Sequence, residues 1–532
     1  MGLSEIIPAL TPLTASYVSY VIGSLISLVL FLVAYQTILH PLSNYPGPFP
    51  AKLTDGYGGY YLLKKRLHLA TYHDHLKYGP VFRSAPNRLV FNTVTALHDI
   101  YLNPNVNKAR IYNQTQFNKH KNIFGTLDRD RHKHKRKVYG QVLSSQSLRI
   151  FEPIMSHEID IFLQQLLKAD GSPINMSPQC ERLTADIAGQ LAFGQPLHTQ
   201  TQEKNRIFPK AMTNMNRIVG LFMAWPLLGN TWPILRRLTR KNGRNFNNAL
   251  QSIIKARMEL PKEAKHDFYS IALNEKVGPG DEGLKRSEIW AEAVFILPAG
   301  GTTVSTALSA VFFYLCRYPE AYKRLADEIR TTFRSGRDIQ TGPLLSGCKY
   351  LRAVIDETLR VAPPFVGTFW REPYVDYDKP FVVDGHVIPK GVMVGVNPYC
   401  VMHNDEYFPE PFTFKPERWL GSDEGGPTSP DNLLTMRRAH APFALGETGC
   451  LGKGMAYMET SLVVAKTLWY FDFETAPGET GRLGEGTPGD GNGRHRKDEY
   501  QLYDIATADH DGPNVVFKPR EQQWRTEAPS AK

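Results

Sequence analysis

Hydrophobic and polar positions divide the chain into a short N-terminal part, in which Glu5 is the one charged side chain, and a long mixed body. The run from Tyr17 to Leu39 contains only uncharged side chains, and at ~1.5 Å per residue a helix of this length would span roughly 34 Å. That is enough to cross a bilayer, so residues 1–40 are predicted to be a membrane anchor with one transmembrane helix at about 17–39. A buried core helix is the alternative interpretation. By the positive-inside rule the body is expected to face the cytosol, because the run is followed by Lys52, Lys64, Lys65 and Arg66.

The segment 41–50 is rich in proline and separates this anchor from the body. Proline fixes φ and restricts the residue before it, which predicts a stiff, non-helical hinge. The prolines of the segment are Pro41, Pro46, Pro48 and Pro50. Residues 51–532 then form the body.

The body combines helical spacing with short alternating segments. Apolar residues recur every three or four positions over most of 125–330, which predicts helices. The pattern of 81–91 is typical of a hairpin about a Pro-Asn turn, and short strands are expected within 374–396. Loops are expected at 421–435 and 477–498. These patterns predict a mainly α protein with small antiparallel β-sheets.

Composition and charge narrow the class of protein. Apolar residues make up 42% and charged residues 21% of the chain, as in a packed globular protein. Its 42 glycines and 38 prolines among 532 residues are too few for a collagenous or disordered chain. The five cysteines are scattered without C-x-x-C spacing, which argues against a disulfide-stapled secreted domain. A net charge of +10 favours anionic partners such as nucleic acid, lipid headgroups or an acidic protein.

A glycine-rich turn near the C-terminus holds the strongest candidate chemistry. Three glycines surround Cys450, and a helical pattern begins directly afterwards. Glycines let a backbone approach a large flat ligand, and a thiolate at a helix N-terminus is stabilised by free N–H groups and the helix dipole. The arrangement suits a thiolate that binds a metal, although a lone cysteine is more often an inert buried thiol. The glycines are Gly446, Gly449 and Gly452.

The spacing F-x-x-G-x-x-x-C-x-G, from Phe443 to Gly452, resembles the haem-ligand signature of the cytochrome P450 family. The resemblance extends over nearly the whole chain, from the anchor to Arg520. It implies the cytochrome P450 fold, a haem-thiolate catalytic domain at 51–532, and haem b (iron protoporphyrin IX) as the cofactor. Cys450 would be the axial ligand of the haem iron, with Phe443, Gly446 and Gly452 against the cofactor.

Two further motifs of the family occur upstream in the expected order. They are E-x-x-R, which begins at Glu357 and ends at Arg360, and the segment P-E-R-W, which contains Arg418. The resemblance implies that these three residues form a buried structural network. A carboxylate paired with two guanidinium groups is stable in the interior only if all three stay together.

The segment Ala299-Gly-Gly-Thr302-Thr303 interrupts a long apolar helical stretch. On its own it is explained by threonine hydroxyls that bond to carbonyls one turn earlier. Beside the cysteine signature it resembles the oxygen-activating segment of the family, which implies catalytic roles for both threonines. Thr303 matches the threonine that orients water, whereas Thr302 stands where the family usually has an acid. Proton delivery is therefore expected to use hydroxyls and water.

Three basic residues match family positions that contact the haem propionates. His132 and Arg136 are four residues apart and therefore share a helix face, and Arg371 follows the E-x-x-R helix. Arginine binds carboxylates strongly and can do so with two hydrogen bonds. Two residues before the cysteine, Thr448 replaces the usual Arg or His.

The basic run 129–137 has three interpretations. It could bind nucleic acid, form an ordinary solvated face, or belong to a surface on which an acidic electron-donating flavoprotein docks. The predicted anchor and the lack of a recognised nucleic-acid motif favour docking of an NADPH-cytochrome P450 reductase. No nucleic-acid partner is expected.

The resemblance also places an apolar substrate pocket. Its expected lining is Phe295, Ala299, Val366, Phe369 and the region around Ile505. The apolar, aromatic segment 220–235 is flanked by basic residues. It is expected to dip into the membrane at the mouth of a substrate channel, with burial in the core as the alternative.

Together these features imply a single-pass haem-thiolate monooxygenase in the endoplasmic reticulum membrane. It would use O2 and electrons from the reductase to oxidise a hydrophobic small molecule, and its sequence resembles fungal microsomal members of secondary metabolism. Two alternatives stay open: a haem-thiolate isomerase or dehydratase that needs no O2, and a non-catalytic haem-binding membrane protein. Turnover without a reductant would favour the first alternative, and haem uptake without oxygen consumption would favour the second.

Overall fold

The computed structural model describes most of the chain. It covers residues 3–520 and 523–524, with gaps at 116–119, 232–233, 235–236, 238–239, 274–284 and 423–425.

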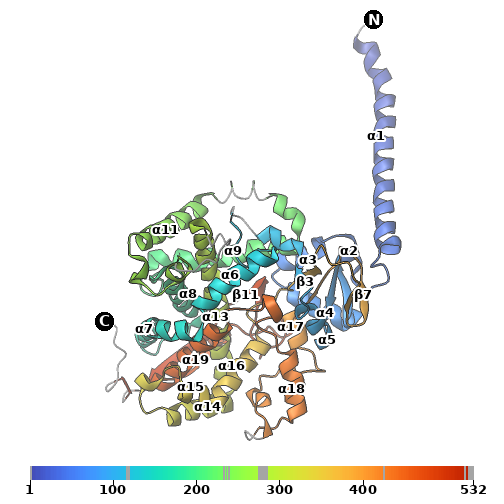
Figure 1. Cartoon of the computed structure of the whole chain (residues 1–532). Coiled ribbons are helices and arrows are strands. Elements are labelled where there is room, and N and C mark those ends of the chain that lie inside the picture. The colour runs from blue at the N-terminus through green and yellow to red at the C-terminus, as the bar shows by residue number, and fades with distance from the viewer. Residues whose placement is uncertain are drawn as a thin grey trace.

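Helix α1 (Leu3–Ala34) stands apart from the rest of the molecule, to which it is joined at one end (Figure 1). It continues into a π-helical turn at Tyr35–Leu39. Two helices in the described part of the chain are long and apolar enough to cross a membrane. The first, Tyr17–Leu39, is not buried against the rest of the protein. The second, Ser287–Arg317, belongs to α13 (Arg286–Arg317), and 67% of its apolar stretch is buried. Helix α1 is therefore a candidate membrane span, and α13 is a core helix.

The proline-rich segment after α1 is fastened to the first hairpin. The ring of His40 bonds to the side chain of Asn87 at 3.1 Å. The buried guanidinium of Arg83 donates to the carbonyl and the side-chain oxygen of Gln36, at 2.7 and 2.6 Å. The body end of α1 is thus held by hydrogen bonds to β1 (Val81–Ala85) and the turn that follows it.

Helices make up most of the body. Besides α1 and α13 they are α2 (Phe49–Leu53), α3 (Gly56–Leu63), α4 (Leu67–Tyr78), α5 (Val94–Tyr101), α6 (Arg129–Val142), α7 (Ser145–Leu167), α8 (Met176–Phe193), α9 (Ile207–Ala224), α11 (Arg240–Met258), α12 (Phe268–Leu273), α14 (Pro319–Thr332), α15 (Pro343–Gly347), α16 (Lys349–Val361), α17 (Pro398–Met402), α18 (Pro430–Ala439) and α19 (Lys453–Tyr470).

Helix α13 runs through the middle of the body (Figure 1). It packs along α8 and also contacts α9, α16 and α19. Leu308, Ala310 and Val311 of α13 are buried because apolar residues occupy nearly the whole circumference of this part of the helix. The core is therefore helix on helix around α13.

Small sheets flank this core. The strands are β1, β2 (Arg88–Phe91), β3 (Val106–Lys108), β4 (Ile174–Asn175), β5 (Arg371–Pro373), β6 (Phe381–Val383), β7 (His386–Ile388), β8 (Met393–Val396), β9 (Phe471–Thr475), β10 (Tyr503–Ile505), β11 (Thr507–Asp509) and β12 (Asn514–Pro519). They form sheets in the orders β1-β2-β8-β5-β3, β4-β12-β9, β6-β7 and β10-β11. The pairings are antiparallel apart from that of β2 with β8, which is parallel.

The predicted mainly α fold with small sheets is confirmed. The hairpin at 81–91 is present as β1 and β2, and 374–396 contains β6, β7 and β8. The segment 477–498 is a loop apart from a short 3-10 helix at Gly478–Arg482.

The expected loop at 421–435 is wrong in its second half, where α18 begins at Pro430. Ser429 caps this helix by accepting the N–H of Asn432, and Pro430 occupies the first turn, where its missing N–H has no cost. The Ser-Pro pair is thus a helix start within the segment that was expected to be a loop.

Candidate active site

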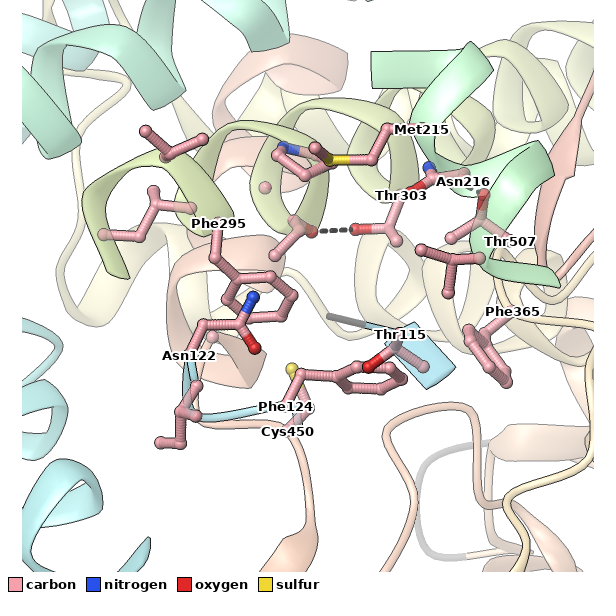
Figure 2. A pocket seen from close by; sticks show the side chains of 18 of the residues that line it. Thr115, Asn122, Phe124, Met215, Asn216, Phe295, Thr303, Phe365, Cys450 and Thr507 are labelled. Atoms are coloured by element: carbon pink, nitrogen blue, oxygen red, sulfur yellow. Dashed lines mark hydrogen bonds between the residues drawn. The ribbon is translucent and has the colours of Figure 1, made fainter. Parts of the chain in front are cut away.

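A cavity of about 2000 Å³ lies under the middle of α13. Figure 2 shows Cys450 on one side of it, opposite Phe295 and Thr303 of α13. Segments distant in sequence line the cavity, including the loop before α6, helices α9 and α11, and the turn between β10 and β11. The fold thus brings the candidate cysteine and the candidate threonine to one chamber.

The turn before α19 fixes the position of Cys450. The Cys450 N–H donates to the carbonyl of Phe443 at 2.8 Å, which closes the turn. Gly446 has φ +69°, and a Cβ there would collide with the carbonyl oxygen of Tyr101, so glycine is required. Burial raises the pKa of the Cys450 thiol, while the N–H groups of Gly452 and Lys453 oppose that shift. The sulfur therefore faces the cavity beside free N–H groups at a helix N-terminus.

Basic side chains gather near the cysteine turn and line the same cavity. Arg136 donates to the carbonyl of Gly449 at 2.9 Å, and Arg371 donates to the hydroxyl of Thr448 at 2.8 Å. Both predicted residues and His132 are thus brought to this end of the cavity. The neighbouring cations make this cluster electropositive. Burial, followed by the charges of Lys108, Arg136, Arg371 and Lys135, lowers the pKa of His132 to about 3, so its ring is uncharged at neutral pH.

Lys108 joins this cluster although no sequence motif marked it. Its ammonium donates to the carbonyls of Ile123 and Phe124, at 2.7 and 2.9 Å. Burial, and then the charge of Arg371, lowers its pKa to about 7. Lys108 is the last residue of β3, and no motif or residue spacing in the sequence around it indicates a binding site. Only the folded structure shows that its side chain lies beside the cysteine turn.

The structure separates the two predicted catalytic threonines. Thr303 lines the cavity, and its hydroxyl donates to the carbonyl of Ala299 at 2.7 Å (Figure 2). Thr302 donates to the carbonyl of Pro298 at 2.7 Å and lies outside the described lining. Both hydroxyls therefore make the back-bond that the sequence alone allowed.

Asn216 of α9 connects Thr302 to the β10–β11 turn. Its amide group donates to the hydroxyl of Thr302 at 3.1 Å and to that of Thr507 at 2.9 Å. Asn216 and Thr507 line the cavity, so Asn216 links the side chain of Thr302 to the chamber. Sequence reasoning missed Asn216 because it lies on another helix, 86 residues away.

Glu459 is a second residue that sequence reasoning missed. It lies in α19, lines the cavity and is 2% exposed. Its Oε1 atom has no hydrogen-bond partner in the described part of the chain. Burial raises its pKa to about 8, so the carboxyl is held in its protonated form at neutral pH.

The expected substrate lining is present in part. Phe295, Ala299 and Phe369 line the cavity, and Phe124 stacks on Phe295 with 5.9 Å between ring centroids. Val366 is fully buried outside the described lining, and Phe365 occupies the cavity wall instead. Neighbouring residues of an extended segment point to opposite sides, which explains the change by one position. The region around Ile505 contributes Ala506 and Thr507.

The segment 220–235 combines buried and exposed residues. Phe222 and Met223 are buried at the end of α9, whereas Leu227 in the following 3-10 helix is 67% exposed. Trp232, Leu235 and Arg236 lie outside the described residues. The core interpretation is therefore correct for the first part, and the exposed apolar part begins after Trp225.

Glu357, Arg360 and Arg418 form one buried cluster. Arg360 donates to both carboxylate oxygens of Glu357, at 2.9 and 2.8 Å, and Arg418 donates to one of them at 3.0 Å. The indole N–H of Trp419 donates to the carboxylate at 2.9 Å. These partners hold the pKa of Glu357 below its ordinary value despite burial. The cluster joins α16 to the 3-10 helix Pro416–Trp419.

Comparison with known proteins gives one consistent result. Residues 46–497 match the family model described as cytochrome P450. The chain belongs to the cytochrome P450 family. It is 32% identical to the cytochrome P450 monooxygenase AKT7 of Alternaria alternata, over 92% of this chain and 94% of that protein. It is 33% identical to the monooxygenase poxM of Penicillium oxalicum, over 93% and 94%. The monooxygenase apf7 of Gibberella fujikuroi is 32% identical over 96% of this chain.

The predicted family and fold are thereby confirmed, and this cytochrome P450 is a monooxygenase with fungal relatives of the secondary-metabolism clade. The family implies a haem-thiolate cofactor, and the donor set fits one. A cavity-facing sulfur, a glycine turn and a surplus of basic groups would satisfy an iron and two propionate carboxylates. The basic groups are Lys108, His132, Arg136 and Arg371.

Proposed function

We propose that this protein is a membrane-anchored monooxygenase that binds haem b through Cys450 and oxidises an apolar small molecule of fungal secondary metabolism. The observation that carries the proposal is the position of the Cys450 sulfur across one chamber from Thr303. When bound there, the haem would supply O2 activation, with the thiolate donating electron density that favours O–O cleavage. Electrons would come from an NADPH-cytochrome P450 reductase.

The chain itself holds and orients the cofactor. Arg136 and Arg371 lie where each could bond to a propionate, and the uncharged ring of His132 could add a hydrogen bond at the same end of the cavity, which Lys108 also lines. The Arg136 and Arg371 contacts to Gly449 and Thr448 also tie this basic end to the cysteine turn. Because the cluster is buried, the attraction between an arginine and a propionate is stronger there than it would be on the surface.

Hydroxyl and carboxyl groups are available to move protons to the chamber. Thr303 presents a hydroxyl to it, and Asn216 links the hydroxyls of Thr302 and Thr507. The carboxyl of Glu459, protonated at neutral pH, lines the cavity from α19. The aromatic side chains of Phe124, Phe295 and Phe365 make the wall of the space above Cys450 apolar.

The reductase would dock on the face formed by α6 and the start of α19. Lys133, Lys137 and Lys453 are exposed there, and Arg136 connects α6 to the cysteine turn. A basic surface attracts an acidic flavoprotein and orients it as it docks. Docking on this face would bring the electron donor close to the cysteine turn. No role for nucleic acid is proposed.

Residues 1–40 would anchor the protein in the endoplasmic reticulum membrane, with 41–50 as the link and 51–532 as the catalytic domain in the cytosol. The unburied apolar helix Tyr17–Leu39 and the basic residues that follow it support this orientation. The exposed side chain of Leu227 and the exposed Leu63 of α3 would add apolar contacts with the bilayer.

A haem-thiolate isomerase or dehydratase is a second candidate. The observation that favours it is the hydroxyl of Thr302 where the family usually carries an acid, which weakens the case for efficient O2 activation. Product formation without a reductant would establish this alternative. Haem uptake without oxygen consumption would instead indicate a non-catalytic haem protein.

The test uses the purified full chain in lipid nanodiscs with a reductase and NADPH. We expect a red-shifted Soret band in the reduced carbon monoxide complex, oxygen consumption, and oxidised products identified by mass in a screen of candidate substrates. Cys450→Ala should abolish the red-shifted band, whereas Cys348→Ala should retain it, since Cys348 is buried away from the cavity. A band that survives in Cys450→Ala would show that another residue binds the iron.

A further inference from the structure

The outer part of the cavity differs in chemistry from the part beside Cys450. Aromatic and aliphatic side chains surround the space near the cysteine and α13, as Phe124, Phe295 and Phe365 do in Figure 2. The lining from α9 and α11 includes exposed polar and charged side chains. A purely hydrophobic substrate explains the first part of the lining but not the second.

Helix α9 places a polar stripe on the cavity. Lys210, Asn214 and Arg217 are separated by four and three residues, so they lie on one helix face, and all three line the cavity. An amphipathic helix normally turns its charged stripe to bulk solvent and its apolar stripe to the interior. In α9 the charged stripe also lines the chamber.

Helix α11 places a matching stripe on the same cavity. Arg244, Asn248 and Gln251 have the same spacing of four and three residues, and all line the cavity. Exposed polar stripes from two different helices therefore line the outer part of the cavity, which we call the opening. One amphipathic surface helix would explain one polar stripe beside the cavity, but it would not explain a second stripe from another helix.

The charge of this opening is positive. Its cationic lining residues are Lys210, Arg217, Arg237 and Arg244, and in the described lining Glu459 is the one acid, located on α19. The side chains of Lys210, Arg237 and Arg244 have no hydrogen-bond or ion-pair partner among the described residues. Arg217 is 3.8 Å from Asp509, a carboxylate that also binds Lys65 at 2.7 Å. The opening thus has uncompensated positive charge.

We propose that the substrate is an amphiphilic organic anion, with an apolar body in the chamber and a carboxylate at the opening between α9 and α11. This inference rests on the proposed monooxygenase function and names the substrate class. Lys210 and Arg244 would bind the carboxylate by charge-assisted hydrogen bonds, and the positive opening would raise the local concentration of anions. The anionic end would fix how deeply the body enters, and so which carbon reaches Cys450.

Matched probes separate this inference from general hydrophobic binding. An imidazole group that binds the haem iron anchors each probe in the chamber, and a polymethylene chain of five to twelve carbons carries a carboxylic acid or its methyl ester at the far end. The full-length holoprotein, in nanodiscs of the neutral lipid phosphatidylcholine, is titrated with each probe by the red shift of the Soret band. Neutral lipid removes anionic headgroups as competitors for the basic opening.

We expect the acid to bind more tightly than the ester at the chain lengths that reach the opening. Exposed charge pairs contribute modestly to binding free energy. The double variant K210Q/R244Q should therefore weaken binding of the acid probe by roughly 2- to 30-fold and leave binding of the ester probe unchanged. Raising the ionic strength should weaken only the acid. Lys255→Gln is the matched control, since Lys255 is an exposed cation of α11 outside the described lining, and its affinities should equal those of the unaltered protein.

Equal affinity of acid and ester at every chain length would overturn the inference. So would loss of acid binding in Lys255→Gln to the same extent as in the double variant, because that would reflect general surface charge. Failure of the proposed function would be seen separately, as a purified protein without the haem-thiolate spectrum or without a Soret shift on adding imidazole itself.

Discussion

At the scale of single residues, Glu459 combines burial, a position on the cavity and an unpartnered oxygen. Above its ordinary pKa of 4.5 the unfolded chain loses this proton, whereas the folded chain keeps it up to about pH 8. The folded state binds the extra proton across that window, so stability falls as the pH rises through it, by at most ~1.4 kcal/mol per pH unit.

Glu459→Gln should remove this dependence. The thermal midpoint of the holoprotein, followed by loss of the Soret band, should fall less between pH 5 and pH 8 in the variant than in the unaltered chain. Glu474→Gln is the control, since Glu474 is 61% exposed in a surface pair with Lys518, and its slope should match the unaltered protein. Identical slopes for all three proteins would show that Glu459 ionises normally.

Thr302 offers a second prediction at this scale. An Asp at this position would remain within reach of the Asn216 amide, which already donates to Thr302 at 3.1 Å, and would supply a carboxylate next to the oxygen-activating segment. We expect Thr302→Asp to raise the ratio of product formed to NADPH consumed. Thr302→Asn, which has the same shape without the acid, should leave this ratio unchanged. An equal ratio in both variants would contradict the proton-relay role.

Motifs in the sequence located the residues whose neighbours are fixed by spacing, and missed those whose neighbours come from elsewhere in the chain. Cys450 and its glycines lie in one turn, so their spacing could be compared with the haem-ligand signature of the family, which indicated a ligand site. Lys108 and Glu459 became visible only once β3 and α19 were packed against the cavity. The family resemblance placed Val366 in the lining, but Val366 is buried outside the described lining and its neighbour Phe365 lines the cavity, because a resemblance does not fix which side of an extended segment faces a cavity.

At the scale of elements, buried charges join helices to loops. Lys135 of α6 pairs with Glu292 of α13 at 2.6 Å, and both side chains are buried. Glu292 also accepts the N–H of Ile123 at 2.9 Å and the hydroxyl of Tyr139 at 3.1 Å. This cluster fixes the loop that carries Phe124 over the cavity, and its partners are too far apart in sequence for any local pattern to pair them.

The Glu357 cluster gives a prediction for element packing. Arg418→Ala removes one guanidinium from a fully buried carboxylate, which should cost about 3–5 kcal/mol of stability. We expect a large loss of the haem-thiolate spectrum on expression, since α16 and the 3-10 helix Pro416–Trp419 would separate. The readout is the ratio of the red-shifted Soret band to total protein.

Arg352→Ala on the same helix serves as the control for the Glu357 cluster. Its pair with Asp356 is formed by an arginine that is 53% exposed, so we expect a cost of about 1 kcal/mol or less and a normal spectrum. If Arg418→Ala behaved like Arg352→Ala, the cluster would not be a structural requirement of the fold.

At the scale of the whole molecule, the predicted helical class and the hairpins followed from local periodicity, whereas the position of α18 and the pairing of β2 with β8 did not. Segments 88–91 and 393–396 are far apart in sequence, and nothing in either indicates a parallel partner. The candidate membrane span Tyr17–Leu39 was predictable because an uncharged run of that length is rare outside membranes.

The junction between α1 and the body yields the last prediction, for which two truncations are compared. Deleting residues 2–34 removes the apolar helix but keeps Gln36 and His40, the partners of Arg83 and Asn87. Deleting residues 2–40 removes these partners as well. Both proteins should leave the membrane fraction for the soluble fraction, since the shorter deletion removes most of the candidate span Tyr17–Leu39 and the longer deletion removes all of it. The longer deletion should also lower the thermal midpoint, because lost hydrogen bonds to Arg83 cost about 1–3 kcal/mol.

Centrifugal fractionation and Soret-monitored melting measure the two effects. Equal melting of both proteins would show that the link adds no stability, and retention of both in the membrane fraction would transfer the anchoring role to exposed apolar residues such as Leu63 and Leu227.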